Sequence, residues 1–220
     1  MEGERYVRGA LQHVPLAVVG ARLKEKRNSL GLSIRALAEK ALVSKTSIVN
    51  LEQGHSCRPA TLVKIAGVMG LHVERFLEPD APPKDGRSAS VHRHDDDRWF
   101  ALQELGAGPV EDLRRPLDES ERARLRAMGL DPLMMMFRNI PLGAGFIAGI
   151  IELKVASEPR QHPGREFLLV LHGQVKVQVG PKTFDLNEGE SLYFEASEEH
   201  SYGPLPGTIE AASILCIRVD

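Results

Sequence analysis

Cysteine is nearly absent from this sequence: Cys57 and Cys216 are the only two among 220 residues. Two distant thiols cannot build the disulfide framework of a small secreted domain, and they do not supply a cysteine-rich zinc site. The length is sufficient for two small domains that each bury a core without disulfides. We therefore expect two reduced structural thiols, one in each domain.

Long apolar runs are also missing. No stretch approaches the roughly 20 apolar residues that span a bilayer. The N-terminal segment carries Glu2, Glu4, Arg5 and Arg8 where a signal peptide would have its apolar core. These absences argue against a membrane partner and predict a soluble, cytoplasmic protein.

The net charge of −2 hides an uneven distribution. Between Gly20 and Ile65 the chain has nine basic and three acidic residues, so the remainder is correspondingly acidic. A local excess of positive charge is the electrostatic footprint expected of a phosphate-binding surface. A basic helix can equally be a solvated face, so the charge needs support from a motif.

The basic segment has the periodicity of several short helices. Apolar residues recur at helical spacing over 18–30, which predicts a first helix. Ser33 can cap a second helix, and Ser44 can cap a third over 45–53. A fourth helix is expected to begin at Pro59. In the third helix, Ile48 and Leu51 share an apolar face, and polar side chains occupy the other.

This segment resembles the phage-repressor-like helix-turn-helix of the XRE family. The matching residues are Leu32-Ser33, Leu37-Ala38, Val43-Ser44, Ile48, Leu51-Glu52, Gly54, Thr61-Leu62 and Ile65-Ala66. The resemblance implies that the third helix enters the major groove of an operator. The DNA-binding residues it implies are Arg35, Ser44, Lys45, Thr46, Ser47 and Asn50. Of these, Lys45, Thr46 and Asn50 have side chains suited to base edges.

One position departs from the family pattern. Ile34 stands where many relatives carry a polar residue, and the neighbouring Arg35 can replace the missing contact. The alternative is that the helices serve only for dimerisation or packing.

The composition changes after the fourth helix and suggests the domain boundaries. Residues 1–17 are expected to be an N-terminal tail, 18–78 the helix-turn-helix domain and 79–98 a linker rich in proline, glycine and serine. A second domain is expected over 99–220. It begins with a strand at Trp99-Phe100 and carries an insertion at about 105–131, with a short helix over 117–128.

From Leu133 onward the apolar period falls to two. Short alternating runs are separated by glycine and proline, as in antiparallel strands joined by tight turns. About eight strands fit between Leu133 and Val219, a number that suits a jelly-roll or barrel. The fold class we expect is multidomain α + β, with an all-α N-terminal domain joined to an all-β C-terminal domain.

The second domain resembles the cupin superfamily. The resemblance rests on His162-Pro163-Gly164, Glu166-Phe167, Val170-Leu171 and Gly173, followed by Leu186, Gly189-Glu190-Ser191, Phe194 and His200. It implies that His162, Glu166 and His200 are metal ligands. Two imidazoles and one carboxylate suit iron, manganese, nickel or zinc and leave positions open for a ligand.

Arg160 stands where the cupin family usually has its first histidine. A guanidinium does not lose its proton to bind a metal. Either the site has three ligands, or it has given up metal and Arg160 anchors the carboxylate or phosphonate of a small effector. A third possibility is a structural remnant in which the histidines and the glutamate only hydrogen-bond to one another.

The combination of domains resembles a large group of bacterial transcriptional regulators. In that group the cupin domain binds a small-molecule effector and shifts the operator affinity of a homodimer. A dimer is expected because operators present paired half-sites.

A second interpretation comes from another functional class. The hydroxypropylphosphonate epoxidase family has the same two-domain layout and lacks the first histidine. The resemblance would make His162, Glu166 and His200 a facial triad for Fe(II) in a non-haem iron oxygenase. Gly31 stands where those enzymes carry a lysine, which favours the regulator.

Overall fold

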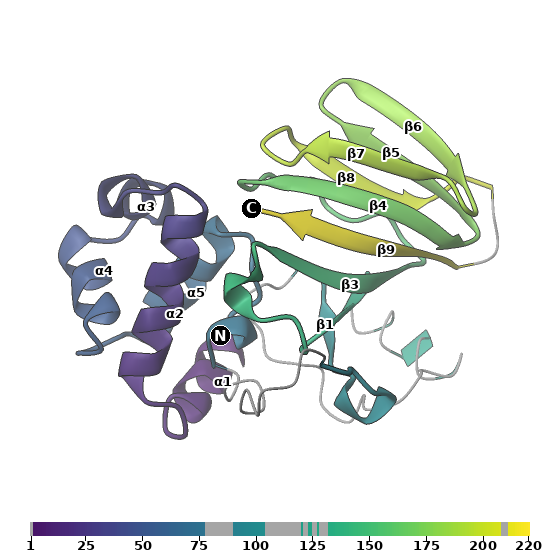
Figure 1. The fold of residues 1–220 in the computed structure, drawn as a ribbon. Coiled ribbons are helices and arrows are strands. Elements are labelled where there is room, and N and C mark those ends of the chain that lie inside the picture. Colours follow the sequence, from purple (N-terminus) through teal and green to yellow (C-terminus); the bar gives the residue numbers. More distant parts are fainter. Residues whose placement is uncertain are drawn as a thin grey trace. The chain divides into compact units, whose positions relative to one another are not determined.

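A computed structural model describes residues 2–77, 90–103, 120, 123–124, 127, 132–207 and 211–220. The chain divides into two compact units, one helical and one made of strands, as Figure 1 shows. The expected α + β fold class is confirmed. Most of the linker over 79–98, the insertion over 105–131 and the helix over 117–128 falls outside the described residues. No described helix combines the length and the apolar character needed to cross a membrane.

The helical unit contains the predicted helices. Its elements are α1 (Glu2–Ala10), α2 (Leu16–Ser29), α3 (Ile34–Ala41), α4 (Lys45–Glu52), α5 (Pro59–Val68) and α6 (Glu74–Leu77). Both predicted caps are present: the hydroxyl of Ser33 accepts from the N–H of Ala36, and that of Ser44 from the N–H of Ser47, each at 3.0 Å. Between α3 and α4 the chain turns at Leu42, whose φ of 52° is left-handed.

Residues 1–17, expected to be a tail, differ from that expectation because they contain helix α1. Val7 in this helix is fully buried, and α1 lies against α5. This helix was hard to predict because a short, highly charged segment owes its helicity to tertiary packing more than to intrinsic propensity.

Helices α2 and α4 approach each other unusually closely at Gly20. A Cβ at this position would overlap the carbonyl oxygen of Leu51, so only glycine fits without a shift of the backbone. Further along α2, Arg27 holds both oxygens of the Glu52 carboxylate, with Nη2 at 3.1 Å, and Nη1 donates to the carbonyl of Leu32 at 2.8 Å. These contacts determine the position of α4 against α2.

The β unit is made of antiparallel strands. They are β1 (Trp99–Ala101), β2 (Leu133–Met136), β3 (Phe146–Leu153), β4 (Arg165–His172), β5 (Gln174–Val179), β6 (Lys182–Asn187), β7 (Ser191–Glu195), β8 (His200–Pro204) and β9 (Ala212–Val219). The 3-10 turn η1 (His94–Asp96) also belongs to this unit, whereas the turn η2 (Leu142–Ala144) groups with the helical unit. One sheet has the order β1-β2-β3-β9-β4-β7 and the other β6-β5-β8. The strand expected at Trp99 and the eight expected from Leu133 onward are confirmed.

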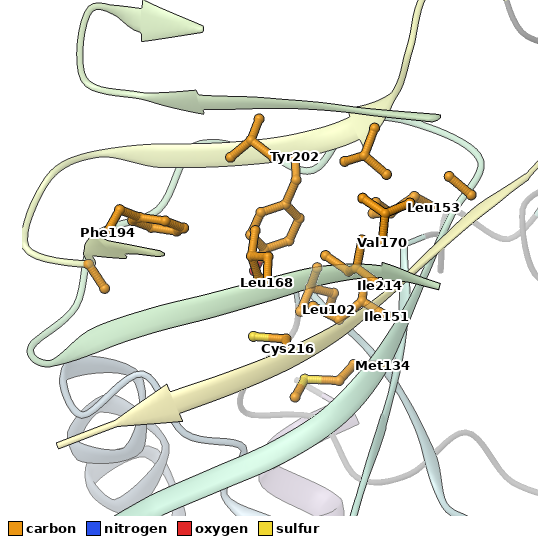
Figure 2. Close-up of a cluster of buried hydrophobic side chains, with 14 of the residues drawn as sticks. Leu102, Met134, Ile151, Leu153, Leu168, Val170, Phe194, Tyr202, Ile214 and Cys216 are labelled. Atoms are coloured by element: carbon orange, nitrogen blue, oxygen red, sulfur yellow. The ribbon is translucent and has the colours of Figure 1, made fainter. Parts of the chain in front are cut away.

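The core of the β unit lies between the inward faces of the two sheets. Alternate residues of β4, β5 and β9 are buried there, as period-two patterning requires. Figure 2 shows the ring of Tyr202 reaching from β8 toward Leu168 on β4, with Cys216 of β9 nearby. This core orients the polar residues at the ends of the same strands.

The close approach of α2 and α4 leads to a test of the helical unit. We expect Gly20→Ala to destabilise it by about 1–3 kcal/mol, because the methyl group forces the two helices apart. The measurement is urea denaturation followed by circular dichroism. Gly67→Ala in α5 is the matched control, since nothing lies within 4 Å of a Cβ there. It should be neutral or stabilise the unit by up to about 1 kcal/mol. Equal stability of both variants would contradict this account of the packing.

Candidate functional site

Three buried polar side chains meet inside the β unit. His162 precedes β4, Glu166 lies near the start of β4, and His200 begins β8. Their exposed fractions are 8%, 3% and 1%. Residues so polar are rarely buried this completely unless they are paired or bind an ion.

The chain positions His162 through a tight turn. Gly164 has a φ of 93°, and a Cβ there would overlap the carbonyl of Val219, so this position requires glycine. Hydrogen bonds from the N–H of His162 to the carbonyl of Ala196 (2.9 Å) and from the N–H of Ala196 to the carbonyl of Gly164 (3.0 Å) hold the turn. His162 is thereby held beside the start of β4.

The ligating atoms of the three side chains converge. Nε2 of His162 lies 2.9 Å from Oε1 of Glu166, and Nε2 of His200 lies 3.9 Å from Oε2. The two imidazole rings stand almost perpendicular, with centroids 5.1 Å apart. One candidate ligand atom from each residue lies within 4.8 Å of the others. Two nitrogen or oxygen ligands on one transition metal ion are about 3–4 Å apart when each bond is near 2.1 Å.

The hydrogen bonds on the far side of each ring determine its tautomer. Nδ1 of His162 donates to the carbonyl of Pro163 at 3.1 Å, and Nδ1 of His200 donates to that of Glu198 at 2.9 Å. A carbonyl only accepts, so each Nδ1 carries a proton and each Nε2 faces the carboxylate. Between Nε2 of His162 and Oε1 of Glu166, a proton or a metal ion must lie.

Two atoms of the cluster have no hydrogen-bond partner. These are Oε2 of Glu166 and Nε2 of His200, both fully enclosed. An unpartnered buried oxygen and nitrogen that face one another are costly unless an ion joins them. The residues therefore fit a metal ion, and no other group of this kind was found among the described residues.

The protonation states also suit a metal. Burial alone would raise the pKa of Glu166, but the hydrogen bond with His162 and nearby positive charges outweigh it, so the pKa lies below its ordinary value. Burial is the largest influence on His200 and lowers the pKa of its imidazole. At neutral pH Glu166 is therefore an anion and His200 is neutral, as metal binding requires.

Neither cysteine takes part in this chemistry. Both are free thiols. Burial raises the pKa of Cys57 to about 11 and that of Cys216 well above its usual value, so both stay protonated at neutral pH.

Arg160 lies next to the three-residue cluster. Its backbone forms a bridge with His200, with N–H to carbonyl distances of 2.9 and 2.8 Å. The guanidinium carbon stands 5.7 Å from the centre of the Tyr202 ring, and Nη1 donates to the carbonyl of Leu102 at 3.3 Å. Arg160 thus lies beside His200, as expected if both belong to one site.

Sequence reasoning missed a second arginine. Arg218 on β9 is 4% exposed and pairs in register with Glu166 on β4. Directly opposed residues share one face of a sheet, so Arg218 faces inward beside the carboxylate. The sequence did contain a sign of this. Ile214 and Cys216 alternate as inward residues of β9, and Arg218 is the next position in that alternation.

The residues predicted to bind DNA lie at and before α4. Lys45 and Thr46 are exposed, and Asn50 is half-buried. The hydroxyls of Ser44 and Ser47 are 2.8 Å apart, so they serve the helix cap as well. Arg35 is exposed on α3 and pairs with Glu39 at 2.8 Å.

A hollow of about 310 Å³ adjoins this surface. Ser47, Asn50, Ser56, Cys57, Arg58 and Thr61 line it. Arg58 is exposed at the start of α5 and adds a cation that was not among the predicted DNA-binding residues. It could have been found from the basic excess between Gly20 and Ile65.

Comparison with known families and structures agrees with this division. Residues 23–76 match the helix-turn-helix family and residues 149–218 the cupin domain family. Hydroxypropylphosphonic acid epoxidase from S. wedmorenis is 18% identical, with 92% of this chain and 97% of that one covered and a TM-score of 0.44. A helix-turn-helix family transcriptional regulator from Vibrio cholerae is 21% identical, with 94% and 97% covered and a TM-score of 0.40. At this similarity neither structure indicates an activity.

The lowered pKa of His200 predicts how stability depends on pH. Because His200 protonates more readily in the unfolded chain than in the folded one, the unfolded state gains stability as the pH falls below about 6.5. The free energy of unfolding of metal-free protein should therefore decrease below this pH, by at most about 1.4 kcal/mol per pH unit for this group. The lowered pKa of Glu166 adds a further loss below about pH 4.5.

Denaturation in urea with EDTA, repeated across pH, measures this dependence. His200→Gln should flatten the slope just below pH 6.5, whereas the exposed His172→Gln should keep it. Identical slopes in all three proteins would show that His200 does not titrate as described.

Proposed function

We propose that this chain, which joins a helix-turn-helix domain to a cupin domain, is a sequence-specific DNA-binding transcriptional regulator that responds to a small-molecule effector. The observation that carries the proposal is the exposed polar face of α4 in a basic unit. A buried polar site occupies the second unit, which gives the chain a place for an effector. A cytoplasmic location is part of the proposal, because the operator DNA lies there.

The arrangement of the helical unit supports DNA reading by α4. Its apolar residues Ile48 and Leu51 are fully buried, so the opposite face is left to Lys45, Thr46 and Asn50. Lysine can donate to guanine, asparagine can pair with adenine, and threonine can contact phosphate or the thymine methyl group. Arg35, Ser44 and Ser47 complete the DNA-binding residues we propose, and Arg58 is added to them as a phosphate contact.

The cupin half would supply the control. We place the effector next to Arg160 and the three-residue cluster, and the homodimer reads two half-sites about one helical turn apart. An effector that binds better in one arrangement of the dimer shifts the population toward that arrangement and so changes operator affinity.

His162, Glu166 and His200 are the metal ligands in this proposal. The unpartnered Oε2 of Glu166 and Nε2 of His200 support it. Iron, manganese, nickel and zinc all accept such a donor set. A bound ion would supply a Lewis acid to which an oxyanion can bind.

A second candidate function is a mononuclear non-haem iron oxygenase or epoxidase. The observation that favours it is the composition of the site, since two histidines and one carboxylate form the facial triad of such enzymes. The fully formed and exposed face of α4 has no role in that chemistry, which is why the regulator is the first candidate.

Substitutions on α4 test DNA reading. Lys45→Ala and Asn50→Ala should each weaken binding to an operator fragment from the upstream region of the gene about tenfold or more, because a base contact is worth about 1–3 kcal/mol. Gel-shift titration measures this. Lys24→Ala, which removes an exposed lysine from α2, is the control for net charge and should have little effect.

Unchanged affinity in both α4 variants, or no bound site for the wild type anywhere in its genome, would contradict DNA reading. A wild-type protein that binds no DNA but consumes oxygen when loaded with iron would support the second candidate instead.

Removing a ligand tests the metal site. Purified wild-type protein should bind about one equivalent of a divalent ion, measured by elemental analysis and calorimetry. Glu166→Gln and His200→Gln should each reduce affinity about 100-fold or more, since a lost ligand is more damaging than a lost outer partner. His172→Gln, an exposed histidine that contacts Glu188, should bind like the wild type. Equal binding by all variants would exclude this site.

A further inference from the structure

The outer face of the six-stranded sheet is apolar across several strands. On β4 and β9 the residues that point away from the core alternate with the buried inward ones. The pairing register aligns these outward residues in rows that cross β3, β9, β4 and β7, the strands that lie side by side in Figure 1. One row is Ile150, Leu215, Leu169 and Ser191, and the next is Ala148, Ile217, Phe167 and Tyr193.

The outer face of the three-stranded sheet has the opposite character. Its outward residues on β5 and their partners on β6 are all polar: Gln174 with Asn187, Lys176 with Asp185, and Gln178 with Thr183. An antiparallel sheet that faces water on one side normally carries polar residues there. The small sheet follows this rule and the large one does not. The outer face of the large sheet is therefore suited to contact with another apolar surface.

Part of this apolar face is accessible to solvent. Tyr193 is 56% exposed, Phe146 is 39% exposed, and Phe167 is half-buried. Toward β1 and β2, by contrast, Trp99 and Met135 on the same face are buried in an apolar cluster of their own. The accessible part therefore lies on β3, β9, β4 and β7. A contiguous exposed apolar patch of this kind marks an interaction site.

The size of the accessible part suits a dimer interface. Strands β3, β4 and β9 each have 8 residues, and β7 has 5. With strands about 4.8 Å apart and a rise of about 3.3 Å per residue, the four strands cover an outline of about 450 Å². Protruding side chains make the accessible area larger than the outline, so it approaches the roughly 800 Å² that each partner buries in a stable complex.

The rim of the face carries charges of both signs. Arg165 of β4 stands directly opposite Glu195 of β7 at one end of the strands, and Glu152 of β3 lies toward the other end. The apolar rows lie between these charges. An apolar centre with a charged rim is the usual anatomy of an interface, and charges of both signs let such a face meet a copy of itself without net repulsion.

We propose that a second copy of this chain docks on this outer face, so that two large sheets pack against each other across a two-fold axis. The homodimer itself belongs to the proposed function, and this inference gives it a location and contact residues. Each copy removes the same apolar area from water, which stabilises the pair. The residues at the centre of the contact are Ile150, Phe167, Leu169, Tyr193, Leu215 and Ile217.

Opposite charges introduced at one central position test the interface. Analytical ultracentrifugation of the full chain over a concentration series should show a wild-type dimer. Phe167→Glu and Phe167→Lys should each weaken self-association about thirtyfold or more, because a central apolar contact is lost and like charges meet across the two-fold axis. An equimolar mixture of the two variants should associate again, since the introduced charges then attract. Native mass spectrometry identifies the resulting heterodimer by its mass.

Gln178→Glu and Gln178→Lys are the matched controls. Gln178 is exposed on the outer face of the other sheet, so both variants should self-associate like the wild type. Circular dichroism checks that each variant is folded. Tyr193→Glu, at an exposed position of the edge strand β7, replaces a Phe167 variant that does not fold and should weaken association as well.

A wild type that is monomeric at every concentration would overturn the proposal, and the face would then contact another part of the chain or a different protein. Equal association of all variants, or equal weakening by the Gln178 and Phe167 variants, would also overturn it. So would two weakened Phe167 variants that do not associate when they are mixed.

Gel-shift on the same samples separates this inference from the proposed function. Protein that binds operator DNA but does not dimerise through this face would overturn the interface and leave the regulator standing. Protein that dimerises through this face but binds no DNA would leave the interface standing and overturn the regulator.

Discussion

Compensation of one buried carboxylate is the constraint around which the β unit is arranged. Glu166 is almost fully enclosed, and a bare carboxylate there would protonate or destabilise the fold. His162 and His200 meet it from two different segments, and Arg218 meets it from the adjacent strand. Local structure positions each partner of Glu166. The turn at Gly164 positions His162, the start of β8 positions His200, and the register of β4 with β9 positions Arg218. The strand pairing therefore also determines which charged groups lie next to Glu166.

In the helical unit the main constraint is the position of α4 against α2. Gly20 lets α2 approach the backbone of α4, and Arg27 holds Glu52 at the end of α4. These contacts use the buried side of α4 and leave its polar side to solvent. A helix that reads a groove must be rigid on one face and unencumbered on the other.

Positive charge has a different environment in each of the two units. Most cations of the helical unit, Lys45 and Arg58 among them, are exposed and suited to the phosphates of a duplex. Salt weakens such binding because it reduces the entropy gained when counterions are released. In the β unit Arg218 is enclosed beside Glu166, where each polar contact is stronger because water is excluded. The same residue types are thus exposed to solvent in one unit and enclosed beside a carboxylate in the other.

Much of this protein could be predicted from local sequence patterns. Ser33 and Ser44 as caps, the positions of α2 to α5, the change to period two and the spacing of His162 and Glu166 all depend on neighbours within a few residues, so the chain alone determines them. Helix α1 was not predicted because its stability comes from packing against α5. Arg218 was not predicted as a site residue because Glu166, which lies opposite it, is far away in sequence. Only the tertiary structure decided that Arg218 lies opposite Glu166. The register of two distant strands is chosen by burial of the whole sheet face, and a shift of one residue would turn Arg218 to the outside.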